Sequence, residues 1–119
     1  MFFIEKTFTF AAAHKLKLNY LSPCQNLHGH EWTVTVYCAR EDVNENGMVI
    51  DFSEIKRLVH GAFDHKTLND VFLGNPTAEN LAKYIADSVP FCYMAKVEES
   101  VGSVAIYKNV AKLAKLNLI

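Results

Sequence analysis

The stretch HGHEWTVTVYCAR, residues 28–40, alternates apolar and polar side chains from Trp32 onward. Because successive side chains of a β-strand point to opposite faces, this period of two predicts a strand with one buried face. His28 and His30 have the parity of the residues expected to be buried, which are Trp32, Val34, Val36 and Cys38. The stretch therefore predicts a strand that presents two imidazoles on its core side, close to its first residue.

A second strand is predicted near the start of the chain. Residues 2–10, FFIEKTFTF, are rich in the aromatic and β-branched side chains that strands favour. His14 has the same parity as Phe8, Phe10 and Ala12. If this strand continues to residue 14, it adds a third imidazole to an apolar face.

The middle of the chain carries a turn signal followed by a helical pattern. Asn46-Gly47 is typical of a β-hairpin, and MVIDF, residues 48–52, is predicted to pair back as a short strand. Asp51 or Ser53 would then cap a helix, because either side chain can accept a hydrogen bond from the first helical turn. The buried stripe of this helix recurs at helical spacing in Ile55, Leu58, Val59 and Ala62.

The second half of the chain predicts a loop, a helix and two strands. Residues 63–76, FDHKTLNDVFLGNP, are rich in turn-forming residues and are predicted to be a loop. Thr77 would cap a second helix, whose buried stripe is Leu81, Tyr84, Ile85 and Ser88 or Val89. Residues 94–101 and 103–108 are predicted to be the final strands. Without the short strand 48–52, this order predicts an α+β fold, in which an antiparallel four-stranded sheet carries two helices on one face.

The composition predicts one small globular domain over residues 1–119. Hydrophobic residues make up 50% and charged residues 21%, which is ordinary for a folded soluble protein. A net charge of −1 gives no basic excess for nucleic acid, and no stretch approaches the roughly 20 apolar residues of a membrane span. Three cysteines without a CxxC pair, and no signal peptide at the start, predict reduced thiols and a cytoplasmic location. Of these, Cys38 and Cys92 have apolar neighbours and are predicted to be buried.

Three neutral imidazoles without a fourth protein ligand describe a catalytic zinc site, where water or substrate takes the open position. His14, His28 and His30 are candidates for it, although a lone histidine is more often an ordinary core or surface residue and the H-x-H spacing alone is weak. Cys24 lies four residues before His28 in a polar loop. Cys24 could be a fourth ligand that closes a structural site. Alternatively it could act beside the metal as a base, because a thiol near Zn²⁺ and an imidazole loses its proton more readily.

Further candidates follow the first helix and occupy the penultimate strand. Asp64 and His65 are adjacent, so they form either a carboxylate-held imidazole for acid–base chemistry or a turn residue beside a solvated imidazole. Glu99 shares the parity of the apolar residues of its strand, and a carboxylate there needs a hydrogen-bonding partner unless that edge is wet. The N–H donors of a pterin or guanine ring would serve. His60 lies on the helix, and we assign it no function.

Six blocks of sequence can be read together: FAAAH (10–14), CQNLHGH (24–30), MVIDF (48–52), FDHKTLND (63–70), NPTAEN (75–80) and VEES (97–100). In this order they closely resemble the 6-pyruvoyl-tetrahydropterin synthase family, over residues 4 to 107. The three residues between Cys24 and the HGH block resemble its bacterial branch, the 6-carboxy-tetrahydropterin synthases of the queuosine pathway. A third branch, which acts on dihydroneopterin-type substrates in folate synthesis, places a glutamate near the cysteine position, and this chain does not.

The resemblance implies the tunnelling fold (T-fold), with the sheets of several subunits joined into a barrel and active sites at subunit interfaces. It also implies a homohexamer of two stacked trimers. The carried-over roles are zinc binding by His14, His28 and His30, catalysis by Cys24 as base with Asp64 and His65 as an acid–base relay, and pterin binding by Glu99, Thr77 and Glu79.

The implied reaction converts 7,8-dihydroneopterin triphosphate to 6-carboxy-5,6,7,8-tetrahydropterin, acetaldehyde and triphosphate. Two alternatives stay open. One is a 6-pyruvoyl-tetrahydropterin synthase, which eliminates triphosphate and keeps the two-carbon unit, and the other is a non-catalytic zinc-binding module closed by Cys24.

The chain departs from the family pattern in two places. Ser100 follows Glu99 where the family usually has threonine, which keeps the hydroxyl. Residues 108–119 form an atypical C-terminal tail, in which Val110, Leu113 and Ala114 could face inward on a short helix with its lysines outward. We expect this tail to pack on its own or a neighbouring subunit rather than on a membrane surface.

Overall fold

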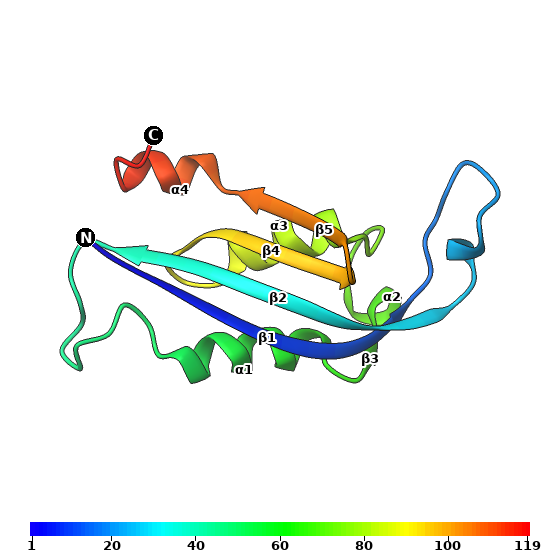
Figure 1. Ribbon diagram of the computed structural model, residues 1–119, viewed down its shortest axis with the longest axis horizontal. Coiled ribbons are helices and arrows are strands. Elements are labelled where there is room, and N and C mark those ends of the chain that lie inside the picture. The colour runs from blue at the N-terminus through cyan, green and yellow to red at the C-terminus, as the bar shows by residue number, and fades with distance from the viewer.

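A hairpin of two long strands forms the centre of the computed structural model, which describes residues 1–119 (Figure 1). Strand β1, Phe2–His14, pairs antiparallel with β2, His28–Arg40, from the Phe2–Arg40 pair through to the His14–His28 pair. The even-numbered residues of both strands face the core, as the alternation predicted. Trp32, Val34 and Val36 are fully buried.

The sheet has five strands in the order β3-β1-β2-β4-β5. Strands β4, Cys92–Ser100, and β5, Ser103–Lys108, extend the hairpin antiparallel on the β2 side. The four-stranded antiparallel sheet expected from the sequence is therefore present. A two-residue strand that the sequence did not predict, β3, Lys66–Thr67, adds a parallel pairing with β1.

Two helices cover one face of this sheet, as predicted. Helix α1, Phe52–Phe63, lies along β1, and α3, Ala78–Ser88, lies behind β4 and β5 (Figure 1). The Asp51 side chain caps α1 by accepting a hydrogen bond from the Ser53 N–H, and Thr77 caps α3 in the same way from Asn80. The buried stripe of α3 differs from the prediction at Tyr84, which is 45% exposed because its ring packs at the margin of the core.

The prediction that residues 48–52 form a strand is wrong. The Asn44 side-chain oxygen accepts hydrogen bonds from the N–H groups of Asn46 and Met48, and the Asn44 N–H donates to the Met48 carbonyl. These local bonds occupy the backbone groups that a hairpin ladder would need. Val49 nevertheless reaches the core and is 3% exposed.

Residues 63–76 are more ordered than the predicted loop. His65 has a φ of 57°, and its N–H donates to the Ala11 carbonyl at 2.7 Å, which turns the chain back alongside β1. Strand β3 follows at once, and then the single helical turn α2, Leu68–Val71, with Leu68 fully buried. The turn-rich composition concealed these elements because each is only a few residues long.

The C-terminal tail forms helix α4, Val110–Lys115, which packs on its own chain through Leu113. The prediction that its lysines point outward is wrong for Lys112. The Lys112 ammonium donates to the carbonyls of Ala86 and Val89, at the C-terminus of α3, where helices attract positive charge. No helix of the protein has the length and apolar character that a membrane crossing requires.

Candidate metal and pterin site

The three histidines predicted from the sequence meet at one end of the β1–β2 hairpin. His14 ends β1 directly opposite His28, and His30 lies two residues further along β2, opposite Ala12. One ring nitrogen from each histidine lies within 4.8 Å of those of the other two. The Trp32 ring packs edge-on against both His14 and His30, with ring centroids 5.0 and 5.5 Å apart, and forms the floor of this cluster.

Backbone carbonyls fix the orientation of two of the imidazoles. His14 Nδ1 lies 2.8 Å from the Pro76 carbonyl, and His28 Nδ1 lies 2.7 Å from the Asn26 carbonyl. Because a carbonyl only accepts, each Nδ1 carries the proton and each Nε2 keeps its lone pair. The Nε2 atoms of His14 and His30 are buried and have no hydrogen-bond partner. Buried nitrogens of this kind fit a metal ion, which would satisfy them.

The electrostatics of His14 also suit a ligand. Its side chain is fully buried, and burial lowers the pKa of His14 below the ordinary histidine value. The hydrogen bond to Pro76 and the nearby Glu99 charge oppose this effect without reversing it. The imidazole is therefore neutral at physiological pH, as metal binding requires.

Glu99 faces this cluster because it shares the face of β4 on which Val97 is buried, and the register with β5 is irregular at this point. Glu98 pairs with Val104 and Ser100 with Ser103, so β4 has one more residue than β5 over this step and Glu99 is the extra one. The Glu99 carboxylate lies 3.7 Å from His14 Nε2 and 3.4 Å from His30 Nε2. The predicted position of Glu99 on the buried face is thus confirmed.

A cleft of about 350 Å³ adjoins the histidine cluster, and Glu79 and Glu99 both line it. The remainder of its wall comes from the start of α3 and from residues 103–106 of β5. Two carboxylates on one small cleft suit a ligand that presents several N–H donors. Thr77 does not line the cleft, and its hydroxyl accepts the Asn80 N–H at the start of α3.

Cys24 lies in a loop that is braced against the same end of the sheet. It sits in a short 3₁₀ turn, Pro23–Gln25, and its carbonyl accepts the Leu16 N–H at 2.8 Å. The Cys24 thiol is half-buried and is not a member of the group of clustered metal-ligand atoms. Two asparagines of residues 69–76 hold the base of the loop. The Asn69 side chain forms hydrogen bonds with the backbone N–H and carbonyl of Lys15. The Asn75 side chain does the same with the backbone of Lys17.

Asp64 and His65 form a second group, which sequence reasoning described incompletely. Asp64 accepts a hydrogen bond from the Ala11 N–H at 3.0 Å, and its other oxygen lies 3.5 Å from His65 Nε2. The same oxygen lies 3.6 Å from Nδ1 of His60, whose Nε2 is 2.6 Å from the Thr9 carbonyl. His60 therefore belongs to this group, and its position one helical turn before Asp64 was the signal that could have revealed it.

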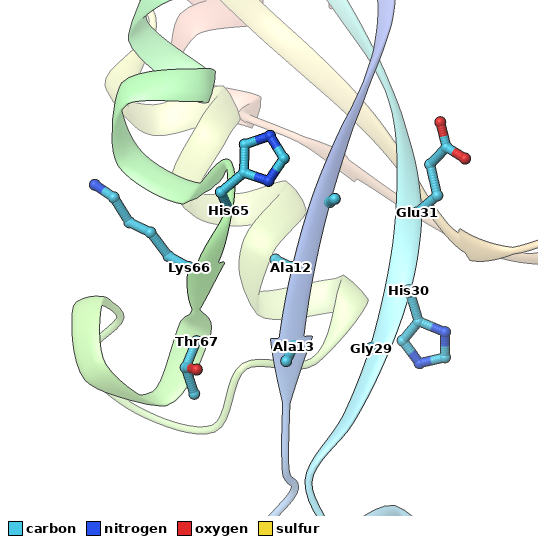
Figure 2. Close-up of a pocket in the computed structure, with 9 residues that line it drawn as sticks. Ala12, Ala13, Gly29, His30, Glu31, His65, Lys66 and Thr67 are labelled. Carbon is cyan, nitrogen blue, oxygen red and sulfur yellow. The ribbon is translucent and has the colours of Figure 1, made fainter.

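Within one chain the structure does not bring this second group into the histidine cluster. Figure 2 shows an open depression over β1 and β2, with His65 on the far side of β1 and the His30 ring pointing away from it. Ala11, Ala13, Gly29 and Glu31 line it from the sheet face opposite the helices. His65 is 83% exposed here, so it is accessible to molecules outside the chain.

The environment of Asp64 gives a pH-dependence that can be measured. The Ala11 N–H, and then the nearby His65 and His60, hold the pKa of Asp64 below the ordinary aspartate value. A carboxyl with a lowered pKa stabilises the folded state above its unfolded pKa, and this contribution is lost as the pH falls through the folded pKa. Wild-type metal-free protein should therefore lose more of its stability than Asp64→Asn between about pH 5 and pH 2. Urea unfolding followed by circular dichroism at each pH would measure this. A stability difference that stays constant or widens in acid would contradict the assignment.

The chain is similar to known proteins over most of its length. The family model described as 6-pyruvoyl tetrahydropterin synthase matches residues 3–116. The chain is 32% identical over 124 residues to the 6-carboxy-5,6,7,8-tetrahydropterin synthase of Bacillus subtilis, covering 90% of this chain and 85% of that protein. It is 37% identical over 121 residues to the Synechocystis sp. protein of the same name, covering 90% and 93%.

A solved structure gives the same result for the fold. The 6-pyruvoyl tetrahydropterin synthase of Caenorhabditis elegans superposes with a TM-score of 0.71 at 28% identity, covering 90% of this chain and 94% of that one. The predicted tunnelling fold is thus confirmed for the single chain. Sequence, fold and family match agree, and the chain belongs to the 6-pyruvoyl tetrahydropterin synthase family.

Proposed function

We propose that this protein is a zinc-dependent carbon–carbon lyase of queuosine biosynthesis. It would convert 7,8-dihydroneopterin triphosphate and one water molecule to 6-carboxy-5,6,7,8-tetrahydropterin, acetaldehyde and triphosphate. The observation that carries the proposal is the convergence of three imidazoles, two with unsatisfied buried nitrogens, beside a cleft lined by two carboxylates. The names of the Bacillus and Synechocystis relatives support this reaction over others in the family.

In this proposal each group has a distinct task. Glu99 and Glu79 accept hydrogen bonds from the N–H donors of the pterin ring and orient it in the cleft, and Thr77 holds the start of α3 beside them. His14, His28 and His30 hold zinc, which when bound supplies Lewis acidity at the substrate side chain. The pterin ring and its side chain are thereby fixed at two separate points.

Proton transfer is assigned to Cys24 and to the Asp64–His65 pair. The Cys24 thiolate removes a proton from the substrate side chain, and His65 returns one elsewhere on the molecule. Asp64, which remains ionised, orients His65 through the contact between its carboxylate and Nε2. Because His65 lies across β1 from His30 in one chain, the Asp64–His65 pair would serve a site completed by a neighbouring subunit, consistent with a homohexamer of two trimers.

Product analysis tests the reaction. Zinc-loaded protein is incubated with 7,8-dihydroneopterin triphosphate, and all products are identified by mass spectrometry. We expect equal amounts of 6-carboxy-5,6,7,8-tetrahydropterin, acetaldehyde and triphosphate. Triphosphate with 6-pyruvoyl-tetrahydropterin and no acetaldehyde would instead support the second candidate, which the Caenorhabditis elegans structure favours. No product at all would support a non-catalytic zinc-binding module.

The proposed reaction takes place in the cytoplasm. All three cysteines are free thiols. Cys38 and Cys92 are fully buried, and their burial is what the sequence predicted. Reduced thiols are the rule in that compartment.

A further inference from the structure

Glu99 faces the histidine cluster in a way that needs explanation. One of its carboxylate oxygens lies 3.7 Å from Nε2 of His14, and the other lies 3.4 Å from Nε2 of His30. A carboxylate only accepts hydrogen bonds, and His14 Nε2 offers a lone pair because its Nδ1 proton is directed at the Pro76 carbonyl. Lone pairs that face one another across a half-buried gap repel, unless a cation lies between them.

The two contacts of Glu99 are about as long as one edge of a zinc coordination polyhedron. Two ligand atoms, each about 2.0–2.1 Å from a tetrahedral zinc ion, lie about 3.4 Å from one another. The separations of 3.4 and 3.7 Å between the Glu99 oxygens and the two imidazole nitrogens are close to this value. The Glu99 carboxylate is thus close enough to His14 and His30 to reach an ion that the three imidazoles hold.

Glu99 also has two properties that an exchangeable ligand needs: its side chain can move, and it can bind a second partner in the cleft. As the extra residue of the bulge it has no partner in the register with β5, and its side chain is 26% exposed. The same side chain lines the cleft assigned to the pterin ring. One carboxylate can therefore serve either the metal or a ligand in the cleft.

We propose that Glu99 is an exchangeable fourth metal ligand, which closes the coordination in the substrate-free protein and leaves when a ring with N–H donors enters the cleft. The exchange opens the metal to the substrate side chain only when the ring is in place. The identity of the ring rests on the proposed function, whereas ligation by Glu99 rests on the geometry alone.

Zinc binding without substrate tests the ligation. Zinc affinity is measured by chelator competition for wild type, Glu99→Gln and Glu99→Asp, with Glu98→Gln as the matched control. Glu98 is the neighbouring carboxylate on the same strand, and its register partners are Thr33 and Val104. We expect Glu99→Gln to weaken zinc binding by about 10–100-fold, and Glu98→Gln to change it less than twofold. Thermal unfolding of the metal-free variants checks that each is folded.

The aspartate variant separates ligation from a general charge effect. It keeps the negative charge but is shorter by one methylene, so direct ligation predicts weakened zinc binding. Zinc affinity equal to that of wild type in either Glu99 variant would overturn the proposal.

Cobalt spectroscopy tests the exchange. In cobalt-loaded wild type, saturation with unsubstituted pterin, which lacks a side chain to bind the metal, should change the visible ligand-field absorption. An unchanged spectrum at saturation would overturn the exchange. These results are distinguishable from failure of the proposed function, because Glu99 variants can lose zinc affinity whatever the products are.

Discussion

His28→Ala is expected to abolish stoichiometric zinc binding and, with it, turnover. His28 stands directly across the ladder from His14, and the Asn26 carbonyl holds its ring in place. Removing it leaves two of the three imidazoles, so zinc affinity should fall by more than about 100-fold, which exceeds the loss typical of changes around a ligand. Turnover should fall to background because no other imidazole lies within this cluster.

Metal analysis after dialysis, together with acetaldehyde release, measures both effects. His65→Ala is the matched control, because it removes an imidazole that lies outside the cluster. That variant should keep one zinc per subunit. Full zinc occupancy in His28→Ala would show that the three imidazoles do not bind the metal together.

Cys24→Ala is expected to keep its zinc but to lose turnover, whereas His28→Ala should lose both. The expected reduction in turnover is about 10²–10⁴-fold, the range for a removed general base. The fold of the loop should survive, because its hydrogen bonds use the Cys24 backbone: the N–H donates to the Ser22 hydroxyl, and the carbonyl accepts from Leu16. Only the thiol is lost.

The same two measurements distinguish the possible roles of this thiol. Cys24→Ser should be nearly as inactive as Cys24→Ala, because a hydroxyl is a far weaker acid than a thiol. Loss of zinc from Cys24→Ala would instead identify the sulfur as a fourth ligand. It would then favour a closed, non-catalytic site.

The parts of the fold that follow a sustained period were predictable from the sequence. The alternation over residues 28–40 predicted not only β2 but also that His28 and His30 lie on the core side. The same parity argument placed His14 and Glu99 on that face, and the structure brings both to one cluster. The one-residue bulge at Glu99 changes the register between β4 and β5 but leaves Glu99 on the same face. A periodic pattern in the sequence does not reveal such a bulge.

The features that were missed depend on single side chains or on tertiary contacts. Asn44 directs residues 44–48 into a local turn, although Asn46-Gly47 predicted a hairpin. Strand β3 exists because the backbone of β1 offers an edge to Lys66 and Thr67, which local composition cannot show. The contact between His60 and Asp64 depends on the helix, which places the two side chains one turn apart.

The hydrogen bonds from Asn69 and Asn75 to the backbone of residues 15 and 17 affect which sequence changes this loop can accept. Both amides bond only the main chain of Lys15 and Lys17, whose own side chains are exposed. These hydrogen bonds can therefore form with any amino acid except proline at those two positions, because proline lacks the N–H. The side chains at positions 15 and 17 can therefore change while the loop that carries Cys24 keeps its attachment to residues 69–76.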